Sequence, residues 1–220
     1  MIDRGREGAF VGKPARNWPL LLGLLVLAAC WLGPLPAMSR TAFSAHMLLH
    51  LGVVALAAPL LAIGLARSGL RVDGLRHSSA AIALIFAAEM VVVWGWHAPP
   101  LHEAAALNVW AFVAQQASFL AVGLGVWLLG FASDSRRGLA AAMFGFFLTF
   151  VHMTMLGVVL IMAPELIYPA ELCLGAFGFA QLDDQRFGGI LMAAWSAVAY
   201  LGGAVLLGAR LLAPGGEKKA

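Results

Sequence analysis

Long apolar runs recur along the whole chain and are separated by short polar stretches. Each run is close to the roughly 20 residues that a helix needs to cross a bilayer, and none alternates apolar and polar residues as a barrel strand does. The runs cover residues 18–36, 43–64, 79–97, 104–131, 139–163 and 188–212. This pattern predicts an all-α fold, a polytopic membrane helical bundle with six transmembrane helices.

These runs leave little of the chain outside the bundle. We expect a cytoplasmic N-terminal segment at 1–17, a six-helix transmembrane domain at 18–212 and a cytoplasmic tail at 213–220. The last outer loop contains an apolar stretch, 172–180, that is too short to span, so an interfacial or re-entrant segment is expected there. The first run also fits a signal peptide with a lipoprotein-type cleavage site before Cys30, and this alternative stays open.

The distribution of basic residues predicts how the helices are oriented. Of the 14 Lys and Arg residues, all but Arg40 and Arg186 fall near the termini or in the second and fourth loops. Basic residues concentrate on the cytoplasmic side of membrane proteins, so both termini are predicted to be cytoplasmic in a cell inner (plasma) membrane. The other loops therefore face outward.

Composition argues against several other classes of protein. The chain is 62% hydrophobic and 11% charged, which favours the lipid bilayer as its main surroundings. The net charge of +3 is spread between the apolar runs, with no basic tract interleaved with aromatic residues. We therefore expect no nucleic-acid partner.

Histidines mark the outer half of the predicted bundle. His46 and His50 lie four residues apart, which places them on one face of a helix. At about 1.5 Å of rise per residue, they and His152 lie between the outer interface and the middle of the bilayer. His97 ends the third run, and His102 in the following loop could join it. Ionisable side chains are costly at that depth, so those present there are expected to have a function.

The residue types at this level suit copper. Imidazole and thioether groups are copper ligands, and methionine favours Cu(I). His46 and His50 lack the adjacent Glu of a metalloprotease motif, so neither an enzyme nor a catalytic residue is predicted. Glu89 could balance a cation, relay protons or hydrogen-bond Gln115. The acidic pair at 183–184 could hold a cation at the mouth of the bundle, or form a solvated cap with the nearby arginine.

Two other functions stay open at this point. Two histidines on facing helices could be the axial ligands of haem in a membrane electron-transfer protein. A small transporter or channel is the other alternative, because a polar path could be lined by Glu89, Gln115, Gln116 and His152. No internal repeat supports the transporter hypothesis.

Five segments follow one another in a recognisable order. They are FSAHMLLH at 43–50, AAPLLAIG at 57–64, WHAP at 96–99, the stretch from His152 to Tyr168 and Pro169, and DDQRFGGILM at 183–192. Together they resemble the CtaG-like assembly factors of caa-type cytochrome c oxidases, over about residues 42–207. The resemblance implies a multi-span membrane protein that helps to mature a haem-copper oxidase, by supplying or holding copper for one of its centres.

The resemblance also implies a ligand set and partners. The histidines of the family correspond here to His46, His50, His97 and His152. We expect these four to bind copper in the outer half of the bilayer, with Met47 or Met153 as soft auxiliary ligands. Subunits of cytochrome c oxidase or copper chaperones are the expected partners. The family pattern implies a further histidine near Gln116, so this chain departs from the pattern at one potential ligand.

Overall fold

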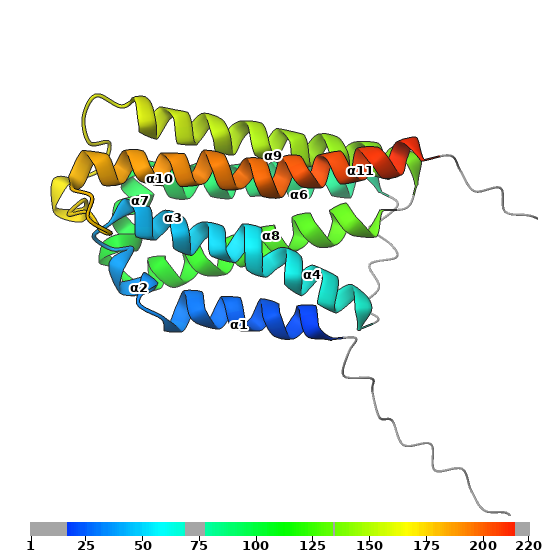
Figure 1. Cartoon of the computed structure of the whole chain (residues 1–220), viewed down its shortest axis with the longest axis horizontal. Helices are drawn as coiled ribbons and strands as arrows, with labels where there is room; N and C mark the ends of the chain where they lie inside the picture. The colour runs from blue at the N-terminus through cyan, green and yellow to red at the C-terminus, as the bar shows by residue number, and fades with distance from the viewer. Residues whose placement is uncertain (1–16, 69–77, 134, 214–220) are drawn as a thin grey trace, which may run out of the picture.

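The structure is a computed structural model that describes residues 17–68, 78–133 and 135–213. Most of the predicted segment 1–17, most of the tail 213–220 and His77 lie outside the described residues. Figure 1 shows an elongated bundle whose long helices run side by side. No strand occurs in the described part of the chain, so the all-α prediction is confirmed.

Five helical stretches are long and apolar enough to cross a membrane. Two contain a π-helical segment: one joins α3 (Phe43–Leu51), η2 (Gly52–Ala57) and α4 (Ala58–Arg67), and the other joins α10 (Gln181–Ser196), η4 (Ala197–Leu201) and α11 (Gly202–Leu212). The remaining three are α6 (Ser79–His97), α8 (Val109–Ala132) and α9 (Arg136–Met162). Helix α1 (Trp18–Leu32) is also apolar but shorter than these five stretches, so the sixth span stays a prediction.

The predicted run 104–131 is divided between two helices. The short helix α7 (Pro99–Leu107) ends where Asn108 interrupts the run. The Asn108 side chain accepts hydrogen bonds from the backbone N–H groups of Trp110 and Ala111, at 2.8 and 3.2 Å. Asparagine is a favoured N-cap residue, so α8 starts anew at this point.

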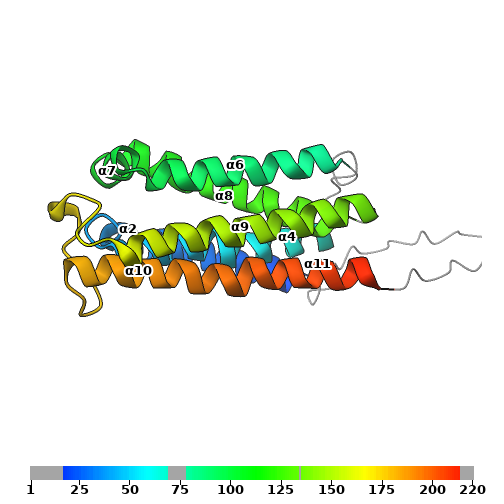
Figure 2. The same ribbon diagram turned by 90° about the horizontal axis from the view of Figure 1, so that it is seen from above.

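An irregular loop joins α9 to α10 and contains one 3-10 turn, η3 (Ala170–Leu172). The loop folds back onto the bundle, because the backbone N–H groups of Leu174 and Gly175 donate to the Thr41 carbonyl, at 2.8 and 3.3 Å. Thr41 follows α2 (Leu35–Met38). Figure 2 shows the loop at the same end of the bundle as α7. The segment expected to be interfacial or re-entrant is thus a loop that lies over this end.

Helix contacts link the spans into one bundle. α4 packs against α1 and α8, α8 against α6, α6 against α9, and α9 against α10, which also contacts α3. In the middle, the π-helical segment η2 presents the Val54 carbonyl to two other spans. This carbonyl accepts hydrogen bonds from Trp127 Nε1 at 2.9 Å and from the Tyr200 hydroxyl at 3.4 Å. Because π segments disrupt the regular helix ladder, such outside donors satisfy the backbone there.

The close approach of α9 and α10 gives a first prediction. A Cβ atom added at Gly157 would lie 2.6 Å from the Gly189 carbonyl oxygen. We expect Gly157→Ala to lower the free energy of unfolding by about 1–3 kcal/mol, since the two helices must move apart. Gly202→Ala is the matched control, because a Cβ atom at Gly202 meets no atom within 4 Å. Denaturant unfolding of both variants in detergent checks this, and equal losses would contradict it.

Candidate functional site

Helix α3 carries two of the predicted site histidines, and a residue of α10 fixes its start. The buried Asp184 carboxylate accepts hydrogen bonds from the backbone N–H groups of Phe43, at 2.6 Å, and of Ser44, at 3.1 Å. It also accepts a short hydrogen bond from the Ser44 hydroxyl and one from the N–H of Ala176, at 3.3 Å. A carboxylate suits the N-terminus of a helix, where unpaired N–H groups gather. Asp184 therefore docks α3 and the covering loop onto α10.

The residues that flank Asp184 continue this structural role. The Gln185 side chain accepts from the N–H of Ile167 at 2.8 Å and donates to the Leu160 carbonyl at 3.4 Å. Arg186 forms a half-exposed ion pair of 3.8 Å with the exposed Asp183. The two acidic residues therefore differ in role. Asp183 is solvated and paired with Arg186, which was one of the two alternatives for the acidic pair. Asp184 is buried and caps the start of α3.

Four buried histidines gather at the end of the bundle that the loop covers. His46 and His50 come from α3, His97 from the last residue of α6, and His102 from α7; none is more than 4% exposed. The His46 ring centroid lies 4.7 Å from that of His102 and 5.6 Å from that of His97. The centroids of His50 and His97 are 5.4 Å apart. We call these four side chains the histidine cluster.

Aromatic side chains enclose the histidine cluster. Tyr168 of the covering loop donates a 2.9 Å hydrogen bond to the His97 carbonyl, and its ring lies 4.2 Å from that of His102. The Phe119 ring lies 4.2 Å from that of His50 on the inner side. Beside His46, a narrow crevice with no room for a water molecule is lined by Arg40, Phe112 and Gln115 among others. The cluster is therefore shielded from bulk water.

Several nitrogen atoms of the histidine cluster have no hydrogen-bond partner. They are His46 Nε2, both ring nitrogens of His50, His97 Nε2 and His102 Nδ1. Leaving a buried polar group unpaired costs about 1–3 kcal/mol, so a cluster of them indicates a place for a bound ligand. His97 Nδ1 lies 2.6 Å from the Val93 carbonyl oxygen. Because a carbonyl only accepts, Nδ1 carries the hydrogen and Nε2 keeps the lone pair that a metal needs.

His102 keeps its lone pair at neutral pH. Burial, with a smaller contribution from His97, lowers the pKa of His102 from 6.5 to about 3. A neutral imidazole is the form that binds metals. Within the described residues, however, no three His, Cys, Asp or Glu side chains are already arranged to hold one ion. The four rings of the histidine cluster thus lie near one another without forming a ready-made ion site.

His152 lies in a separate hydrogen-bonded group. Its Nε2 is 3.0 Å from Glu89 Oε2, and the same oxygen accepts a 3.1 Å hydrogen bond from the Thr149 hydroxyl. Glu89 is fully buried, and its Oε1 and His152 Nδ1 have no partner. The hydrogen-bond partners of Glu89 are therefore two residues of α9, and not Gln115. The Gln115 side chain instead accepts a 3.3 Å hydrogen bond from its neighbour Gln116.

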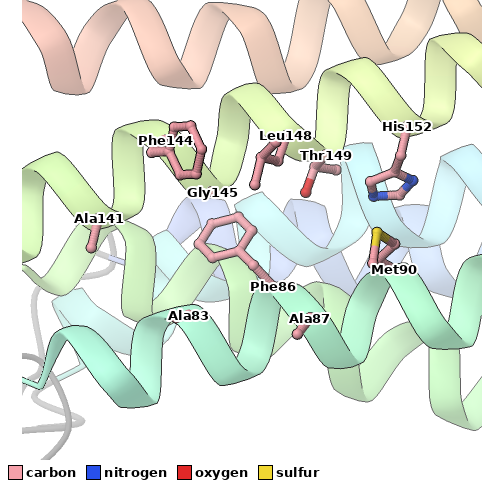
Figure 3. Close-up of a pocket in the computed structure, with 10 residues that line it drawn as sticks. All are labelled: Ala83, Phe86, Ala87, Met90, Ala141, Phe144, Gly145, Leu148, Thr149 and His152. Atoms are coloured by element: carbon pink, nitrogen blue, oxygen red, sulfur yellow. The ribbon is translucent and has the colours of Figure 1, made fainter.

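A pocket of about 230 Å³ lies between α6 and α9 beside this group. Figure 3 shows His152 and Met90 at one end of the pocket and Ala83 and Ala141 toward the other. The walls are almost wholly apolar, apart from Thr149 and His152. His152 is close enough to His50 for an electrostatic interaction between them. It stands at the edge of the cluster, and its role as a ligand stays a prediction.

The two methionines expected as auxiliary ligands are fully buried in the core. A Cβ atom added at Gly188 of α10 would lie 3.1 Å from Met47 Cγ, so the Met47 side chain of α3 packs against α10. Met153 belongs to the same hydrophobic core. Ligation of copper by either one stays a prediction.

The sequence offers His102 only as a possible neighbour of His97, and the structure places it within the histidine cluster. It lies five residues beyond His97, but α7 starts at Pro99 and turns the chain so that its ring faces His46. The Pro-Pro pair after the third apolar run is the sequence signal for this turn, since proline favours the first turn of a helix.

Comparison with known proteins identifies one family over almost the whole chain. The family model described as cytochrome c oxidase caa3 assembly factor (Caa3_CtaG) matches residues 4–213. The match includes every described helix. No curated protein and no solved structure matches the chain.

Proposed function

The chain belongs to the cytochrome c oxidase caa3 assembly factor family, and we propose that it serves the oxidase by holding copper at the histidine cluster. Membership makes it a membrane protein that assists cytochrome c oxidase assembly. The observation that carries the copper proposal is a set of four buried histidines from three helices with unpartnered ring nitrogens. No catalytic step is needed, so the protein acts as a non-enzymatic assembly factor.

The proposed ligands are His46, His50 and His97, with His102 as the fourth. Imidazole is a good ligand for copper, and these rings reach one another from α3, α6 and α7. His152 is a further candidate at the edge of the cluster, oriented by Glu89 in the manner of a carboxylate that positions a metal-binding histidine. An oxidase subunit or a copper chaperone on the outer face of the plasma membrane is the proposed exchange partner.

Space at the site favours a single ion over haem. The crevice beside His46 and His102 has no room for even a water molecule, and so none for a porphyrin. Haem would also need its two axial rings on opposite faces of the macrocycle, whereas the His46 and His102 centroids are only 4.7 Å apart. An absorption spectrum of the purified protein checks this, because a Soret band would indicate haem.

Copper quantification tests the site assignment. We expect purified wild-type protein loaded with Cu(I) to keep stoichiometric copper after desalting, and His46→Ala/His50→Ala to lose it. His77→Ala is the control, because His77 lies in a loop predicted to be on the opposite side of the membrane. Circular dichroism verifies that the double variant is folded. Stoichiometric copper in the double variant, or its absence from the wild type, would overturn the proposal.

A further inference from the structure

Two arginines stand at the end of the bundle opposite the histidine cluster. Arg67 lies in the last turn of α4 and Arg210 in the last turn of α11. Both line one cavity of about 380 Å³. Its other walls are apolar and include Ala62, Ile63, Ala66, Trp127, Leu128 and Phe131. The cavity therefore combines a cationic mouth with an apolar interior.

Contacts with neighbouring groups position both guanidinium groups. Arg210 donates from Nη2 to the Ser133 carbonyl at 3.2 Å and from Nη1 to the Phe131 carbonyl at 3.5 Å, at the end of α8. The Arg67 guanidinium stands 5.8 Å from the centroid of the Trp18 ring. Both side chains remain exposed. Cationic groups near the last turn of helices are also favoured by the helix dipole.

The surroundings of this cavity match an anionic lipid. Arg136 and Arg137 at the start of α9 lie at the same end of the bundle (Figure 1), which is the predicted cytoplasmic side, and the cytoplasmic leaflet carries anionic phospholipids. Guanidinium groups pair well with phosphate oxygens. An acyl chain would suit the apolar interior, where a free phosphate ion would find no partner.

We propose that this cavity binds an anionic phospholipid, with its phosphate between Arg67 and Arg210 and one acyl chain along Trp127 and Phe131. The lipid would join the ends of α4, α8 and α11, which all line the cavity. A zwitterionic lipid fits less well, because its ammonium group would approach the same two guanidinium groups. This proposal is independent of copper and of the histidine cluster.

Native mass spectrometry of the full chain from mixed micelles tests the proposal, with phosphatidylglycerol and phosphatidylcholine as probes. We expect preferential retention of phosphatidylglycerol by the wild type. Each basic side chain near an anionic lipid contributes about fivefold in affinity, so Arg67→Gln/Arg210→Gln is expected to lower this preference about 30-fold. The control Arg136→Gln/Arg137→Gln makes the same charge change at the start of α9, at exposed residues that do not line the cavity.

A second variant separates lipid binding from damage to the fold. Ala66→Trp fills the exposed part of the cavity and keeps both arginines, so it is expected to displace phosphatidylglycerol without unfolding the protein. Equal retention of the two lipids by the wild type would overturn the proposal. So would an equal loss in the control pair, which would indicate attraction by general surface charge, or full retention in Ala66→Trp.

Discussion

Replacing Asp184 by alanine is expected to lower the free energy of unfolding by about 3–5 kcal/mol. The substitution leaves the N–H groups of Phe43, Ser44 and Ala176 without their acceptor. Each buried group left unpaired costs about 1–3 kcal/mol, and loss of a helix cap alone costs about 1 kcal/mol. Thermal and denaturant unfolding in detergent measure the effect. Because α3 carries His46 and His50, copper retention should fall with it.

The neighbouring carboxylate is the matched control for this prediction. Asp183 is exposed and forms only a 3.8 Å ion pair with Arg186. Exposed ion pairs contribute about 0–1 kcal/mol, so Asp183→Ala is expected to have little effect on unfolding. If the two alanine variants were equally stable, Asp184 would not be the residue that docks α3 onto α10.

Replacing Glu89 by glutamine is expected to weaken copper binding about 10–100-fold while the helical content is kept. Partners that orient metal-binding histidines typically contribute this much to affinity. Glutamine keeps a side-chain oxygen that can accept from Thr149, but it replaces the carboxyl group that faces His152 with an amide. Competition with a Cu(I) chelator measures the affinity.

Glu103→Gln is the control for Glu89→Gln, because Glu103 is exposed on α7 at the same end of the bundle. We expect its copper affinity to match that of the wild type. An unchanged affinity in Glu89→Gln would show that the Glu89–His152 pair is a structural contact between α6 and α9, and His152 would no longer be a candidate ligand.

The spans were predictable where apolar runs end at polar residues. The run 79–97 coincides with α6, and the run starting at 43 coincides with the start of α3. The start of α10 was missed by several residues, because the polar segment from Gln181 to Arg186 interrupts the apolar signal that marks a span. The split at Asn108 was missed for the opposite reason, since apolar residues flank the capping asparagine on both sides.

The local part of the site was predictable and the tertiary part was not. The i, i+4 spacing of His46 and His50 places them on one face of any helix. The pairing of His152 with Glu89 depends on how α9 meets α6, and the sequence left several partners open for that carboxylate. The cap that Asp184 provides joins residues about 140 positions apart, so no local pattern indicates it.

X-ray absorption at the copper edge of copper-loaded protein tests most directly whether imidazole groups of the histidine cluster hold copper. We expect a first shell of nitrogen atoms with the multiple scattering of imidazole rings in the wild type, lost in His46→Ala/His50→Ala. A wild-type spectrum without imidazole scattering, or the same imidazole shell in the double variant, would contradict it.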